Sequence, residues 1–133
     1  MTRLGYAVAV GLAVASCDAA SKPVDPAWGK QACKSCGMIV SDAKFAAELS
    51  TRDGERAFFD DPGCMASYVH ERGVDPSFMW VRSDAATWIL ASSARYARGA
   101  HTPMDYGFVP SATGDATWSD VEAAAQGRGR ETR

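Results

Sequence analysis

Cysteine and methionine are the residue types of this 133-residue chain whose side chains could most readily do chemistry. The segment from Cys33 to Met38 holds two thiols and a thioether within six residues, and Cys64 and Met65 form a second pair. Met104 follows later in the chain. Thiolate and thioether ligands favour soft cations such as Cu(I), whereas oxygen ligands suit magnesium, calcium or manganese. The sulfurs could therefore bind a metal, form a disulfide or fill a core.

The spacing Cys33-x-x-Cys36 serves both redox dithiols and zinc sites. A thioredoxin-type dithiol needs a helix that begins at the first thiol, because the helix dipole lowers the pKa of that thiol. Here Gly37 follows at once and the next residues favour a turn and a strand, which disfavours a catalytic dithiol. A disulfide-stapled or thiol-redox protein remains an alternative.

A structural zinc site is a second alternative, and it needs four ligands in a tetrahedron. The three thiols and a histidine, His70 or His101, are the available set. On a helix, residues six apart point about 120° away from each other, so Cys64 and His70 are poorly placed to chelate one ion.

The remaining candidates differ in their expected surroundings. Cys64 is predicted at the third residue of a helix, and Met65 belongs to the apolar stripe of that helix, which favours core packing. Met104 is expected in a loop bounded by proline and glycine, near His101, so that its thioether could serve as a ligand. No arrangement of nucleophile and base is recognisable, and we predict that the protein is not an enzyme.

Residues 1–16 resemble a bacterial lipoprotein signal peptide. Arg3 precedes an apolar run that is too short to span a bilayer, for which about 20 residues are needed. The run ends in a lipobox-like Val14-Ala15-Ser16-Cys17, which predicts lipidation of Cys17. We therefore expect a membrane-anchored, periplasm-facing protein, on either the inner or the outer membrane.

Composition supports one folded domain and excludes some partners. The net charge of −2 gives no electrostatic case for nucleic acid. Beyond Cys17 the chain has three cysteines, an odd number, so at least one thiol is free, metal-bound or paired between chains. Residues 17–31 read as a lipid-anchored spacer, 32–125 as the folded domain and 126–133 as a disordered tail.

Turn and cap residues predict the elements that must position these side chains. Strands over 44–51 and 56–59 flank an Asp53-Gly54 turn. A helix follows, with Asp61 as its N-cap, Pro62 at its first position and Gly73 at its end. A strand is expected over 78–82.

The second half predicts strands over 87–90, 95–97 and 107–109. A short helix over 119–125 would begin at a capping box formed by Ser119 and Glu122. The predicted fold class is α+β.

Three blocks of residues, in this order, resemble the NosL family of nitrous-oxide-reductase accessory lipoproteins. They are Cys36-Gly37-Met38, Phe59-Asp60-Asp61-x-x-Cys64-Met65 and Thr102-Pro103-Met104, behind the lipobox. The resemblance covers about residues 33–115 and implies a small domain of two related strand–strand–helix–strand units, similar to part of the organomercurial lyase fold.

The resemblance also implies a function. It is that of a lipid-anchored copper chaperone, which would deliver Cu(I) to a copper enzyme, foremost nitrous oxide reductase, and to the machinery that assembles it. By position, Cys36, Met38 and Met104 are the implied ligands, with Cys33, Cys64, Met65 and His101 as further candidates. Asp105 stands where the family more often has glycine, which leaves the geometry of that loop open.

Overall fold

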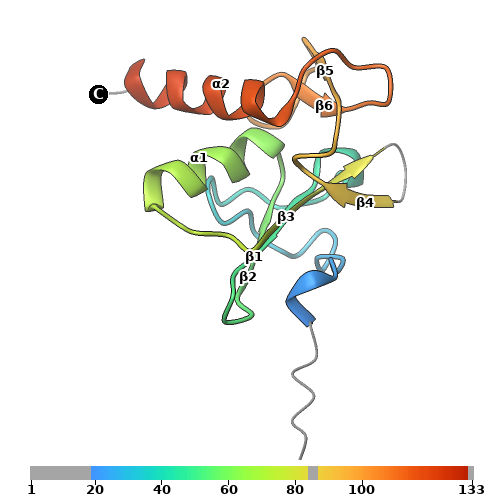
Figure 1. The fold of residues 1–133 in the computed structure, drawn as a ribbon, viewed down its shortest axis with the longest axis vertical. Coiled ribbons are helices and arrows are strands. Elements are labelled where there is room, and N and C mark those ends of the chain that lie inside the picture. Colours follow the sequence, from blue (N-terminus) through green and yellow to red (C-terminus); the bar gives the residue numbers. More distant parts are fainter. Residues whose placement is uncertain (1–18, 84–86, 132–133) are drawn as a thin grey trace, which may run out of the picture.

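The computed structural model describes residues 19–83 and 87–131 as a mixed α+β domain (Figure 1). The predicted leader and Cys17 lie outside the described residues. Two single-turn 3₁₀ helices come first, and two α-helices and six strands make up the rest. The bounds are η1 Ala19–Ser21, η2 Ala43–Phe45, β1 Ala47–Ser50, β2 Arg56–Phe59, α1 Pro62–Arg72, β3 Phe78–Ser83, β4 Thr87–Leu90, β5 Tyr96–Arg98, β6 Phe108–Pro110 and α2 Trp118–Glu131.

Strands β1 to β4 form an antiparallel sheet in the order β2-β1-β3-β4. The turn at Asp53-Gly54 joins β1 and β2, as predicted, and Gly54 has a φ of +88° that glycine adopts without strain. Helix α1 follows β2 directly and packs against α2 (Figure 1). β5 and β6 pair in a separate two-stranded sheet.

The ends of α1 confirm the predicted signals. The Asp61 side chain accepts a hydrogen bond from the Gly63 N–H, Pro62 is the first helical residue, and Gly73 closes the helix with a φ of 61°. An N-cap and a left-handed C-cap satisfy backbone groups that a helix leaves without partners. The N-cap therefore determines that α1 begins at Pro62. This position places Cys64 in the first turn of the helix.

Strand alternation gives the four-stranded sheet one apolar face and a second face that mixes charged and aromatic side chains. Leu49, Phe59 and Val81 point to one side and belong to the buried core with Met65 of α1. Glu48 and its cross-strand partners Phe58 and Trp80 point to the other side. A segment before the first strand covers that second face.

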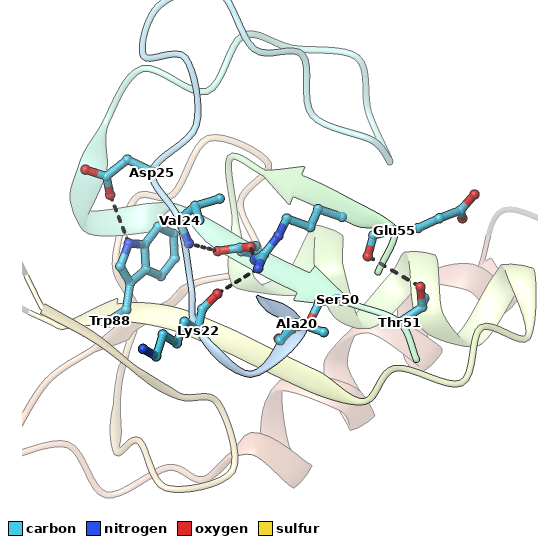
Figure 2. Close-up of polar contacts among 10 residues, drawn as sticks. Ala20, Lys22, Val24, Asp25, Ser50, Thr51, Glu55 and Trp88 are labelled. Carbon is cyan, nitrogen blue, oxygen red and sulfur yellow. Dashed lines mark hydrogen bonds and ion pairs between the residues drawn. The ribbon is translucent and has the colours of Figure 1, made fainter. Parts of the chain in front are cut away.

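Residues 20–28 form this covering segment, which we call the strap (Figure 2). The Val24 N–H donates to the Glu48 carboxylate at 2.8 Å, and the Ser50 hydroxyl donates to the Ala20 carbonyl at 2.7 Å. Asp25 accepts from Arg82 at 2.5 Å and from the Trp88 indole at 2.9 Å. The strap is therefore part of the domain.

Three sequence predictions need correction. Residues 20–28 of the predicted spacer form the strap, which is docked on the sheet. The predicted tail begins inside α2, which continues to Glu131 because Arg128 donates hydrogen bonds to the carbonyls of Met104 and Asp105. The helix also begins at Trp118, before the predicted cap Ser119, and the Asp120 carboxylate accepts from the Thr117 N–H at 2.8 Å.

The halves of the domain also differ from each other. The first half has the predicted order strand, strand, helix, strand, whereas the second half has three strands and then a helix. β4 extends the first sheet and leaves only β5 and β6 for the second. Among the described residues, no helix has the length and apolar character needed to cross a membrane.

Candidate metal centre

Three thiols and one carboxylate converge where β2 meets α1. The Sγ atoms of Cys33, Cys36 and Cys64 and a carboxylate oxygen of Asp60 all lie within 4.8 Å of one another. Cys33, Asp60 and Cys64 are buried, with 3%, 3% and 1% of their surface exposed, and Cys36 is partly exposed. This donor set could hold a metal ion.

A tight turn places the first two thiols. The Cys33 N–H donates to the Met38 carbonyl at 2.7 Å, and the Gly37 N–H donates to the Cys33 carbonyl at 3.0 Å. Gly37 has a φ of +79°, which a residue with a Cβ rarely adopts. The Lys34 N–H donates to the Phe58 carbonyl at 2.9 Å, which attaches the turn to β2.

The end of β2 and the first turn of α1 place the other two donors. Asp60 is the first residue after β2, and Cys64 is the third residue of α1, as predicted. The Cys64 N–H donates to the Asp61 carbonyl at 3.0 Å. Because the N-cap fixes where the helix begins, it also fixes the direction of the Cys64 side chain.

The three thiols do not titrate alike. A hydrogen bond with Cys64 lowers the pKa of Cys33 to about 7. Burial, and then the neighbouring Cys33, raise the pKa of Cys36 to about 11. The hydrogen bond to Cys33 and burial raise the pKa of Cys64. Of the three thiols, Cys33 therefore loses its proton most readily, and a metal that binds all three sulfurs must displace the protons of the other two.

The two oxygens of the Asp60 carboxylate differ: Oδ1 accepts a hydrogen bond, whereas Oδ2 has no partner among the described residues. The Cys36 thiol donates to Oδ1 at 3.3 Å. Oδ2 is buried, and no polar group of the described residues forms a hydrogen bond with it. None of the ion pairs among the described residues includes Asp60. A buried carboxylate in this situation is costly unless a cation offsets it.

The loop of Met104 reaches the same end of α1. The Met104 N–H donates to Asp61 Oδ2 at 3.2 Å, next to Asp60 in sequence. The Tyr106 ring lies against Gly63, where an added Cβ would come within 2.0 Å of the ring Cγ. Asp105 has a φ of 55°, a left-handed conformation that glycine adopts readily and other residues rarely adopt. The loop thus adopts a glycine-like backbone in spite of the aspartate.

The predicted ligands fall in three settings. Cys36, Cys33 and Cys64 meet in the cluster. Met38 follows the turn with 48% of its surface exposed, and Met104 is partly buried against the core. Met65 is completely buried in the core, as its helical stripe indicated, and His101 is exposed.

Sequence reasoning missed Asp60 as a donor. It placed Asp61 at the N-cap of the helix and gave the adjacent Asp60 no role of its own, although one N-cap needs only one carboxylate. Asp61 performs that role, and Asp60 turns towards the thiols. The surplus acid immediately before a helix that carries a cysteine in its first turn was the available signal.

Comparison with known proteins gives no relative from which a function could be transferred. No family model matches the chain, and no curated protein or solved structure is similar to it. The residues of the cluster are therefore the basis for a proposed function.

Proposed function

We propose that this protein is a lipid-anchored, extracytoplasmic Cu(I) chaperone that delivers copper to a copper enzyme. The observation that carries the proposal is the meeting of three thiols, from two separate segments, at one point of the fold. The NosL-like motifs favour nitrous oxide reductase and its assembly machinery as the recipient. The chain would act as a carrier, without catalytic turnover.

The chemistry of the cluster supports a soft cargo. Thiolate sulfur selects Cu(I) over the hard cations that compete in the same compartment. The pKa of Cys33 is lowered to about 7, so Cys33 is the thiol that gives up its proton to an incoming ion most readily.

The exposure of the cluster suits transfer to a partner. Cys33 and Cys64 are buried, whereas Cys36 is partly exposed and Met38 is largely exposed just beyond it. A partner could approach from that side and take the ion by ligand exchange. In this proposal Met38 and Met104 supply thioether ligands at the edge of the site.

A thiol-redox function is less well supported. An exchange reaction needs a thiolate that a second protein or a small disulfide can reach. Cys33 has the lowest thiol pKa of the three, yet only 3% of its surface is exposed.

Competition with a chromophoric Cu(I) chelator, carried out without oxygen on the reduced full chain, tests the proposal. We expect one Cu(I) per chain. Cys33→Ser, Cys36→Ser and Cys64→Ser should each weaken Cu(I) binding by at least about 100-fold, the upper end of losses seen when residues behind metal ligands are changed.

Cys17→Ser is the matched control, since it removes one thiol from the predicted lipidation site. It should release the protein from membranes and leave Cu(I) affinity unchanged. Unchanged Cu(I) affinity in all three cluster variants, or the absence of Cu(I) binding by the parent chain, would refute the proposal.

A further inference from the structure

The donor set contains one group that a sulfur-bound Cu(I) carrier does not need. Asp60 brings a carboxylate to three thiols, and its Oδ2 lacks a hydrogen-bond partner among the described residues. A carboxylate is a harder ligand than a thiolate and suits zinc and other divalent ions better than Cu(I).

We infer that Asp60 gives the cluster a second binding mode, in which a four-coordinate divalent cation of the zinc type takes three thiolate sulfurs and one carboxylate oxygen. The inference concerns the site of the proposed function, but it requires only that the cluster binds metal. It makes Asp60 the residue that determines which ion the site accepts.

The dimensions of the cluster fit such an ion. In a tetrahedral zinc site with bonds of about 2.3 Å to sulfur, the sulfurs lie roughly 3.8 Å apart. The four donor atoms here already lie within 4.8 Å of one another, so that side-chain movements of about 1 Å would close the tetrahedron. They come from three places on the chain: the turn, the end of β2 and α1.

Charge also favours a divalent ion in this mode. Three thiolates and a carboxylate bring four negative charges to a largely buried position, and a divalent cation offsets twice as much of that charge as Cu(I) does. Cu(I) can be coordinated by sulfur ligands alone, and the Asp60 carboxylate would then have no cation bound to it. The carboxylate therefore shifts the preference of the cluster towards divalent ions.

The fourth ligand of this mode differs from the histidine that the sequence offers for a zinc site. His70 and His101 are both exposed, and neither belongs to the cluster. The fourth donor is Asp60, which is placed by the same β2–α1 junction that places Cys64.

The test compares Zn(II) and Cu(I) on the same samples of reduced full chain. Asp60→Asn keeps the shape of the side chain and removes its charge, and Asp53→Asn makes the same charge change on the exposed hairpin turn. We expect Asp60→Asn to weaken Zn(II) binding by about 10- to 100-fold or more. Cu(I) affinity should change by less than about threefold, and Asp53→Asn should change neither.

Co(II) provides a spectroscopic check, because its visible absorption reports four-coordinate geometry with sulfur ligands. The parent chain should show tetrahedral bands with sulfur-to-cobalt charge transfer, and Asp60→Asn should alter them. Unchanged Zn(II) affinity and Co(II) spectra in Asp60→Asn, or equal losses of Zn(II) and Cu(I), would overturn the inference.

The two proposals fail in different ways. A parent chain that binds Cu(I) but no Zn(II) refutes the second binding mode and leaves the chaperone proposal intact. A parent chain that binds Zn(II) but no Cu(I) refutes the chaperone proposal and leaves the second binding mode intact. If Asp60→Asn does not fold, a crystal structure of the parent chain with Cd(II) decides. A carboxylate oxygen of Asp60 bound to cadmium supports the inference, and an Asp60 turned away from it overturns the inference.

Discussion

Two buried carboxylates of the domain, Glu48 and Asp60, have contrasting surroundings. Glu48 on β1 faces the strap and is fully buried, and it accepts hydrogen bonds from the Val24 N–H and from Arg56, with which it forms an ion pair. Asp60, just after β2, is 3% exposed, and its Oδ1 accepts a hydrogen bond from the Cys36 thiol. No cationic side chain of the described chain is ion-paired with it.

The difference separates a structural role from a functional one. A buried charge persists in a stable fold when hydrogen bonds and an opposite charge offset part of its loss of hydration, as they do around Glu48. Asp60 has only part of that compensation, and what it lacks is a cation. On the strap side Glu48 has its cation, whereas the donors of the cluster could still hold one.

The largest expected effect comes from removing the partner of Glu48. Arg56→Met leaves the Glu48 carboxylate buried without its cation, and we expect a loss of about 3 kcal/mol in the free energy of unfolding at neutral pH. Chemical denaturation of the full chain measures the loss.

Arg52→Met on the exposed hairpin turn is the control for this change, and it should cost less than about 0.5 kcal/mol. If the two arginine variants were equally stable, the ion pair between Arg56 and Glu48 would not stabilise the fold.

A smaller effect distinguishes the two acids directly. Glu48→Gln should lower the free energy of unfolding by about 1–3 kcal/mol, because it disrupts a hydrogen-bonded pair that is in place. Asp60→Asn should change the free energy of unfolding of the metal-free protein by less than about 1 kcal/mol, since it removes a charge that forms no ion pair with the described residues.

Addition of Zn(II) should then reverse the order of sensitivity. Ligand binding stabilises the folded state in proportion to its affinity, so the parent chain and Glu48→Gln should gain thermal stability from Zn(II), and Asp60→Asn should gain much less. Equal gains in all three proteins would show that Asp60 does not distinguish the cluster from the strap side.

The contrast also shows what local sequence signals can predict. The Asp53-Gly54 turn, the Asp61-Pro62 start of α1 and its Gly73 end were all predicted, because a turn or a cap is encoded by residues next to one another. The thiol of Cys64 was correctly expected in the first turn of α1 for the same reason.

What was missed depends on packing between distant segments. Asp60 faces the thiols because the turn after Cys33 is hydrogen-bonded to the backbone of Phe58. The strap has the composition of a linker, yet Asp25 finds Arg82 and Trp88 across the sheet. Glycines at 127 and 129 predicted a disordered tail, but packing on α1 and the bonds from Arg128 keep that segment helical. None of these partners is adjacent in sequence.

The smallest expected effect is a dependence on pH that belongs to Glu48. Burial raises the pKa of this carboxyl above its ordinary value of 4.5, in spite of the Val24 N–H and Arg56, which act to lower it. The folded state therefore binds a proton more readily than the unfolded state, and stability falls as pH rises through the window above 4.5. The free energy of unfolding of the parent chain, minus that of Glu48→Gln, should accordingly be largest near pH 4.5 and decline towards pH 7. Denaturation of both proteins at several pH values measures this difference, and a difference that rises with pH would mean that the ion pair, rather than burial, dominates at Glu48.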